Sequence, residues 1–191
     1  MLKVKFKPVQ FSDLELLRQW RNSPRISNNM YNNDFISQQQ QEGWFESLQH
    51  DECKIYFVCL LDDKAVGTLY FTDIKESSCE WGCYLGGESL IPGLGLILEA
   101  AALEYAFNYL KIKTLNADVL TFNTPAKKMH KLFKYNELGI EDTEIIRGNE
   151  ILQVCKYNYC EINWLSNKEQ VFKSLPKKLV TSIRNIKFIK E

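Results

Sequence analysis

The sequence predicts one α/β domain of the α+β kind, with a central mixed, mostly antiparallel sheet of about seven strands and helices on both faces. Two observations predict it. Apolar residues alternate over short, turn-bounded runs typical of strands, and other runs repeat with helical spacing. The 191 residues are 45% apolar and 25% charged, an ordinary balance for a globular domain that is long enough to bury a sizeable core.

The first segment reads as a strand followed by two short helices. Leucine, valine and phenylalanine alternate with lysines over residues 2–6, as in a half-buried strand. Ser12–Glu15 has the pattern of a capping box, and the helix that it opens should end before Pro24. Ser37–Gln40 has the same pattern and should open a helix that runs through Leu48.

The middle of the chain predicts three strands and a long helix. Ile55–Leu61 and Ala65–Phe71 flank Asp62-Asp63, so we expect a hairpin. Cys79–Leu85 reads as the next strand, and an apolar helix should run from about Gly93 to Leu110.

The remaining segments complete the sheet. Thr114–Leu120 is a predicted strand, and Asn123–Phe133 is a predicted helix. Ile140–Ile146 and Ile151–Tyr159 flank a short glycine-containing turn, which indicates a final hairpin. We therefore expect the domain to span residues 1–163.

The C-terminal residues, 164–191, read as a basic helical extension, and Ser166–Glu169 is the predicted cap of its helix. A solvated basic face explains this charge more simply than contact with RNA or an anionic membrane. In the whole chain, 24 basic residues balance 24 acidic ones, so bulk charge argues against a nucleic-acid partner.

Cysteine and histidine usage argues against a metal site. The six cysteines form no CxxC pair and there are only two histidines, so no bound metal is expected. The N-terminus lacks a signal-peptide core, and no apolar run is long enough to span a membrane. These features predict a cytoplasmic protein without an integral membrane segment, and they leave the oligomeric state open between monomer and homodimer.

The turn before the long helix carries the clearest functional signal. Gly93, Leu94, Gly95 and Leu96 form the start of that helix, directly after a predicted strand and loop. A helix N-terminus presents free N–H groups and a positive dipole end, and glycine keeps side chains away from them. We therefore expect the backbone amides around these four residues to bind a phosphate group.

This order of elements, with Gly93-Leu94-Gly95 opening the central helix, resembles the GNAT superfamily of acetyl-CoA-dependent N-acetyltransferases. The first position of the family's loop motif, usually arginine or glutamine, is Leu90. A second family motif is similar to Asn123–Tyr135, in which Asn123 and Ala126 match and His130 stands at the usual tyrosine position. The resemblance covers about residues 2–160.

The resemblance implies acetyl-CoA as the co-substrate. It places the pyrophosphate on the amides of Gly93–Leu96 and the second motif, including Ala126, beside the cofactor. Leu85, last in its strand, and Asn123 on the facing turn are the expected partners of the pantetheine arm. Asn123 also suits the N-cap of its helix, and one asparagine can serve both roles.

A closer resemblance concerns the substrate. The runs Leu17–Pro24, Asn29–Tyr31 and Cys79–Leu85 are similar to the PseH subfamily. Those enzymes acetylate the 4-amino group of UDP-4-amino-4,6-dideoxy-N-acetyl-β-L-altrosamine, on the route to pseudaminic acid. The residues that would hold the nucleotide sugar by this resemblance are Arg21, Met30, Tyr31 and Trp44. An aromatic ring in the asparagine-rich loop, such as Tyr31, suits stacking on uracil.

Acetyl transfer to an amine needs a proton acceptor and a proton donor. Glu80 lies opposite the bulky apolar side of its strand, so it is the candidate base, and Asp73 is the second candidate. Either carboxylate also suits a plain surface or turn role. His130 is the candidate donor to the leaving thiolate, with a structural histidine as the alternative.

Two other functions fit the sequence. The Trp20-Arg21-Asn22 run also resembles acetyltransferases of ribosomal-protein N-termini, so a protein or peptide N-terminus is an alternative substrate. The departures at Leu90 and His130 also fit a GNAT module that binds acetyl-CoA without catalysis. Turnover with UDP-amino sugars or with peptides, and release of CoA, would separate these alternatives.

Overall fold

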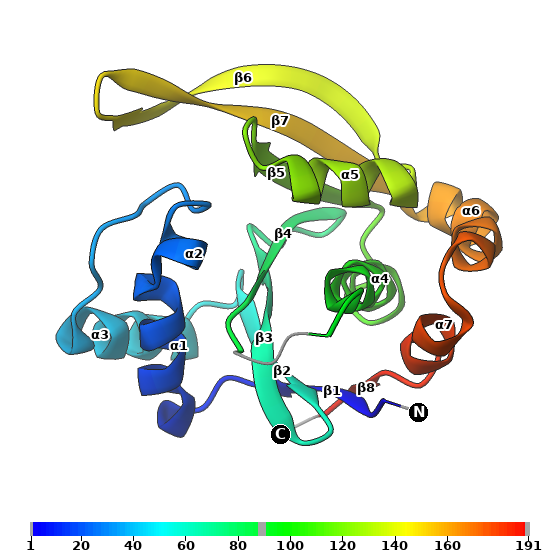
Figure 1. Cartoon of the computed structure of the whole chain (residues 1–191), viewed down its shortest axis with the longest axis horizontal. Helices are drawn as coiled ribbons and strands as arrows, with labels where there is room; N and C mark the ends of the chain where they lie inside the picture. Colours follow the sequence, from blue (N-terminus) through cyan, green and yellow to red (C-terminus); the bar gives the residue numbers. More distant parts are fainter. Residues whose placement is uncertain (1, 88–90, 190–191) are drawn as a thin grey trace.

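The computed structural model describes residues 2–87 and 91–189. These residues form a mixed sheet in the strand order β6-β7-β5-β4-β3-β2-β1-β8 (Figure 1). The strands are β1 (Val4–Pro8), β2 (Ile55–Leu61), β3 (Lys64–Thr72), β4 (Ser78–Leu85), β5 (Thr114–Leu120), β6 (Asn136–Arg147), β7 (Glu150–Cys160) and β8 (Lys187–Phe188). The predicted class is confirmed. The sheet has one strand beyond the expected seven because β8 pairs in parallel with β1.

Helices cover both faces of this sheet. They are η1 (Phe11–Asp13), α1 (Leu14–Asn22), α2 (Pro24–Ser27), α3 (Gln38–Gln49), α4 (Leu94–Asn108), α5 (Thr124–Phe133), α6 (Glu161–Ser174) and α7 (Lys177–Ile183). Figure 1 shows α1, α2 and α3 on one side of β2–β4, and α4 on the other side with α6 and α7 beyond it. None of the helices among the described residues is long and apolar enough to cross a membrane.

The N-terminal helices confirm one predicted cap and correct another. At α3, the Gln40 N–H donates to the Ser37 hydroxyl at 3.2 Å, and the Ser37 N–H donates to the Gln40 side chain at 2.8 Å. The capping box predicted at Ser12 is wrong. There the Asp13 carboxylate accepts from the Gln10 N–H at 3.0 Å, because the chain forms a 3₁₀ turn before α1.

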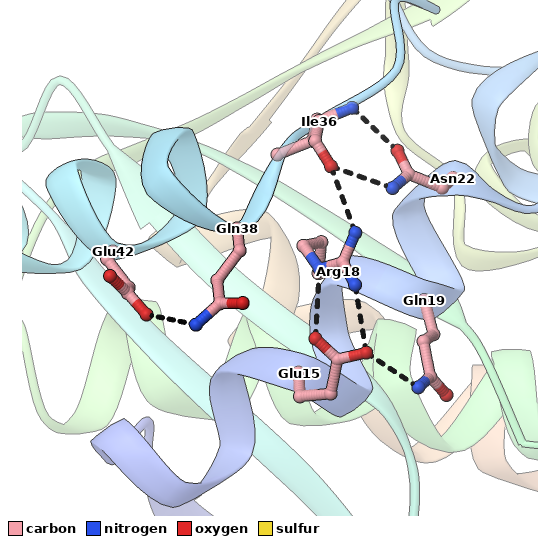
Figure 2. A network of polar contacts seen from close by, with 7 residues as sticks. All are labelled: Glu15, Arg18, Gln19, Asn22, Ile36, Gln38 and Glu42. Carbon is pink, nitrogen blue, oxygen red and sulfur yellow. Dashed lines mark hydrogen bonds and ion pairs between the residues drawn. The ribbon is translucent and has the colours of Figure 1, made fainter.

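The segment between α2 and α3, called here loop 28–36, is tied back to α1 (Figure 2). The Asn22 side chain donates to the Ile36 carbonyl at 2.9 Å and accepts from the Ile36 N–H at 2.8 Å. Arg18 donates to the same carbonyl at 3.4 Å and to the Glu15 carboxylate at 2.9 Å. One end of the loop is therefore fixed to a helix.

The predicted β2–β3 hairpin is confirmed, and so is the helix that follows β5. Asp62 and Asp63 turn the chain with φ of 49° and 65°, a conformation that aspartate tolerates better than most residues. Helix α5 begins after Asn123, whose side chain accepts from the Ala126 N–H at 3.3 Å. The capping role expected for Asn123 is therefore present.

The sheet divides at β4. Within the described residues, the parallel ladder between β4 and β5 covers only Ser78–Glu80 and Thr114–Asn116. Strand β4 continues to Leu85 and stays paired with β3 as far as Gly67. One edge of β4 beyond Glu80 is therefore left open, and the two halves of the sheet separate there.

The C-terminal part belongs to the main core. Helix α6 begins at Glu161, so the cap predicted at Ser166 is wrong; the Ser166 hydroxyl instead donates to the Ile162 carbonyl at 2.9 Å inside the helix. Trp164 and Leu179 are buried in the same hydrophobic cluster as α4 and the sheet. Residues 161–189 thus pack as part of the domain.

Candidate active site

A cavity of about 640 Å³ lies where β4 and β5 separate. Its walls come from β3, β4, β5, α5, α2 and loop 28–36, and Glu99 is the lining residue from α4 in the described part of the chain. Of the predicted site residues, those lining this β4–β5 cavity are Met30, Tyr31, Glu80, Leu85, Asn123, Ala126 and His130. The split in the sheet therefore brings together residues from both halves of the chain.

The open edge of β4 suits an extended acyl-carrier arm. Leu85 is the last residue of β4 and lines the cavity. On the opposite edge of β4, Leu85 is paired with Gly67 of β3. An exposed strand edge offers backbone N–H and C=O groups to an extended ligand. Asn123 lines the opposite wall, although its side-chain oxygen is engaged as the α5 cap.

The predicted phosphate-binding turn lies outside the lining of this cavity. Leu94 and Leu96 donate their N–H groups to the carbonyls of Ile91 and Gly93 at 3.3 and 3.0 Å. Within residues 2–87 and 91–189, the N–H groups of Gly93 and Gly95 have no acceptor. Phosphate binding at these two amides stays a prediction. Leu90, the first motif position, lies outside the described residues.

Packing explains the two glycines more directly than ligand access does. Gly93 has φ +87°, and a Cβ there would lie 2.4 Å from Leu179 Cδ1 of α7. A Cβ at Gly95 would lie 2.9 Å from the sulfur of Met129, a residue that lines the cavity. Position 93 requires glycine because its backbone is left-handed and Leu179 lies close by. Position 95 requires glycine because α4 and α5 approach each other closely there.

His130 lies on the cavity wall in a buried pair. Its Nδ1 is 2.6 Å from Oε1 of Glu99 on α4, and the two side chains are 5% and 1% exposed. The imidazole stacks on Tyr135 with ring centroids 4.4 Å apart and meets Trp81 and Tyr157 at 5.8 and 4.9 Å. Neighbours on several sides therefore hold the ring in place.

Glu80 and Asp118 are charged groups that line the cavity together. Burial, followed by the nearby Asp118 carboxylate, raises the pKa of Glu80 above its ordinary value. Asp118 accepts from the Lys156 ammonium at 2.6 Å and from the Tyr31 hydroxyl at 3.1 Å. Glu80 is thus a stronger proton acceptor than a free glutamate, because a raised pKa means a more basic carboxylate.

Asp73, the second candidate base, does not line the cavity. It occupies the turn after β3 with φ 49°, and its carboxylate pairs with Lys75 at 2.7 Å. Its position agrees with a turn residue. Of Asp73 and Glu80, only Glu80 lines the cavity.

Arg147 holds the loop that carries two predicted substrate contacts. From the end of β6 its guanidinium donates to the carbonyls of Asn28 at 2.9 Å, Met30 at 2.6 Å and Tyr31 at 3.5 Å. Figure 1 shows the β6–β7 hairpin arching toward this loop. Loop 28–36 is therefore anchored at both ends, by Arg147 and by Asn22.

Arg21 and Trp44 are not brought to the cavity. Arg21 donates to the Asn32 carbonyl at 3.4 Å. Trp44 packs edge-on against Tyr56 at 5.0 Å, and Tyr56 stacks on Tyr70, which does line the cavity. Their predicted contacts with a nucleotide sugar stay predictions, and in this conformation both support the wall from behind.

Several site residues were missed from the sequence, among them Glu99, Asp118, Arg147 and Lys156. Glu99 carried a usable signal, since it is a lone charge among buried apolar residues in the first turns of α4. Such a residue requires a partner. Asp118 and Lys156 are brought together by the register of β5 and β7, which places them opposite each other. Such a pairing between distant segments is not visible in the local sequence.

Comparison with known proteins decides the family. Residues 3–133 match the model of the acetyltransferase (GNAT) domain. The chain belongs to the GNAT acetyltransferase family. It is therefore an acetyl-CoA-dependent N-acetyltransferase, and the predicted fold, enzyme class and family resemblance are confirmed.

Two relatives are named acetyltransferase PseH. The protein from Campylobacter jejuni serotype O:23/36 is 32% identical over 145 residues, covering 75% of this chain and 88% of the relative. That from serotype O:2 is 31% identical over 163 residues, covering 84% and 98%. The predicted PseH resemblance is thus confirmed at the level of sequence.

Solved structures agree on the fold. The spermidine N-acetyltransferase of Vibrio cholerae, in complex with CoA and spermine, superposes with a TM-score of 0.80 at 18% identity, covering 85% of this GNAT chain and 98% of that one. Campylobacter jejuni PseH superposes with a TM-score of 0.63 at 22% identity, covering 84% and 98%. At these identities the likeness concerns the fold alone.

Proposed function

We propose that this GNAT enzyme moves the acetyl group of acetyl-CoA to the 4-amino group of a UDP-linked amino-dideoxy sugar, in the cytoplasm. The observation that supports it most is the lining of one cavity, to which β4 contributes Glu80, β5 Asp118, α5 His130, and loop 28–36 Met30 and Tyr31. The two PseH relatives point to the same substrate class.

The chain's residues divide the work by position. The open edge of β4 up to Leu85 aligns the pantetheine arm, and the amides of Gly93 and Gly95 face the pyrophosphate. Acetyl-CoA supplies a thioester carbonyl that an amine can attack. Glu80 takes the proton of the incoming ammonium, directly or through water, so that the nitrogen lone pair is free. His130 delivers a proton to the departing sulfur.

Transfer is direct, without an acyl-enzyme. Cys83 is the cysteine in the lining of the cavity. Burial, followed by the Glu99 carboxylate, raises the pKa of the Cys83 thiol well above its ordinary value. Because the thiolate is the nucleophilic form, a thiol with so high a pKa is a poor acyl acceptor.

A panel of amines tests the substrate. CoA release is measured with a UDP-4-amino-4,6-dideoxy sugar, its dTDP counterpart, a ribosomal-protein N-terminal peptide and spermidine. We expect saturable release with the UDP sugar and little with the others. Release with the peptide or spermidine alone would contradict the substrate, and acetyl-CoA binding without release for any amine would support a non-catalytic module.

A further inference from the structure

His130 pairs with Glu99, a buried glutamate that lies outside the family motif of residues 123–135. We propose that Glu99 is a positioning residue that fixes the orientation and tautomer of His130, so that His130 can protonate the leaving thiolate. This inference rests on the proposed function only in needing a thioester as acyl donor, and it holds for any acetylated amine.

Glu99 is a buried acid that pairs with His130 and also interacts with the neighbouring Tyr135 phenol. It lies on α4, among residues that include Leu98, Ala100 and Ala101, all with no measurable exposure. Its side chain is 1% exposed and contacts Nδ1 of His130 at 2.6 Å, across 31 residues of sequence. A carboxylate buried without a partner would cost several kcal/mol. The histidine is therefore what makes the buried acid tolerable.

The contact determines which nitrogen of His130 is available. When Glu99 is a carboxylate, its oxygen is an acceptor, so in the proposed arrangement Nδ1 donates to Glu99 and carries a hydrogen in both the neutral and the cationic ring. Nε2 is then the nitrogen that exchanges a proton. Stacking on Tyr135 at 4.4 Å and edge contact with Tyr157 at 4.9 Å keep the ring from turning over.

Among the described groups packed on this ring, Glu99 supplies the negative charge. Trp81 comes from β4, Tyr135 follows α5 and Tyr157 comes from β7. Burial raises the pKa of Tyr135 well above its usual value and that of Tyr157 to about 12, so both phenols stay neutral near pH 7. The Cys83 thiol near Glu99 is also neutral, since burial raises its pKa.

The proton transfer balances without any further reagent. As the carbon–sulfur bond breaks, the Nε2–H bond of the imidazolium breaks and a sulfur–hydrogen bond forms. The ring becomes neutral and keeps its Nδ1–H bond to Glu99. The proton released by the attacking amine, accepted at Glu80, returns to bulk water, from which Nε2 is protonated again. A positioned proton donor of this kind contributes about 10²- to 10⁴-fold to a rate.

Nuclear magnetic resonance can determine the tautomer of His130 in the absence of substrate. The chain has two histidines, and His50 is exposed, so His50→Asn leaves one imidazole signal. Two-bond ¹H–¹⁵N correlation spectra should show the Nδ1–H tautomer of His130. The side chain of Glu99→Gln can donate as well as accept, so this variant should no longer hold the ring in a single Nδ1–H tautomer.

Activity gives the second readout. In Glu99→Gln, kcat should fall about tenfold or more while KM for acetyl-CoA changes less than twofold. His130→Phe should lower kcat about 100-fold. Glu104→Gln is the matched control: the residue is on the same helix, but it bonds Trp164 at 2.9 Å and Lys168 at 2.6 Å. Its His130 tautomer and its kcat should be those of the parent.

Two results would overturn the inference: an Nε2–H tautomer in the parent protein, or a Glu99→Gln variant whose ring tautomer and kcat match the parent. A loss of folding in Glu99→Gln would be seen by circular dichroism, and the tautomer of the parent would still decide. If the panel of amines gives no turnover, the proposed function fails, whereas the imidazole spectra still report on the Glu99–His130 pair.

Discussion

Arg147 links the β6–β7 hairpin to the loop that carries Met30 and Tyr31, and its removal should weaken binding of the amino substrate. The guanidinium donates to three backbone carbonyls, at 2.9, 2.6 and 3.5 Å. These contacts span about 117 residues of sequence. Arg147→Ala removes all of them while leaving the acetyl-CoA side of the cavity unchanged.

The size of the effect follows from these contacts. A hydrogen bond to a charged group contributes about 1.5–3 kcal/mol. Two of the three contacts are short, but all are partly open to solvent, so we assign about 1.5–3 kcal/mol to the whole set. Because the loop must be ordered again when substrate binds, this free energy appears as a roughly 10- to 100-fold increase in KM for the amine.

Steady-state kinetics of CoA release, with each substrate varied in turn, measures this effect. KM for acetyl-CoA should change less than twofold. Arg184→Ala is the matched control, since Arg184 pairs with Glu169 on the C-terminal helices at 2.9 Å, far from the cavity lining. An unchanged KM for the amine in Arg147→Ala, or an equal rise in Arg184→Ala, would refute the reasoning.

Three further predictions concern the cavity and the turn before α4. Tyr31→Ala should weaken UDP-sugar binding about tenfold by calorimetry, because a stacking ring is lost, and should spare acetyl-CoA; equal affinities would discard stacking. Asp118→Asn should move the acid limb of kcat/KM to lower pH, because Asp118 raises the pKa of the base Glu80; an upward move would exclude Glu80. Gly93→Ala should cost about 2–4 kcal/mol of unfolding free energy in urea, from its φ of +87° and a neighbour 2.4 Å from the new Cβ. Gly148→Ala, with φ +64° and open space, should cost only about 1 kcal/mol, and similar losses would refute the packing argument.

Local signals in the sequence predicted the elements well where a few neighbouring residues determine the backbone. The Asp62-Asp63 turn and the Ser37 and Asn123 caps depend on contacts within four residues, and the structure contains all of them. Ser12 failed as a cap because Gln10 and Asp13 form a competing turn one step earlier. Ser166 failed because α6 starts directly after β7, at Glu161.

The site itself was predicted in part. Glu80 and His130 were found from strand alternation and from the family motif, and both line the cavity. Glu99 and Arg147 were missed because their partners lie 31 and more than 115 residues away, so only the folded arrangement brings them together. The predicted contact of Trp44 with a nucleotide sugar stays a prediction, and in this structure its ring packs on Tyr56 behind the cavity wall.

We propose that acetyl-CoA enters where β4 and β5 separate and presents its thioester between Glu80 and His130. A crystal structure of the enzyme with CoA and the UDP-amino sugar tests this most directly. We predict the pantetheine arm along the open edge of β4, the pyrophosphate at the amides of Gly93 and Gly95, and the sulfur within reach of the His130 ring. CoA bound elsewhere, with the β4–β5 cavity vacant at saturating ligand, would contradict this binding mode.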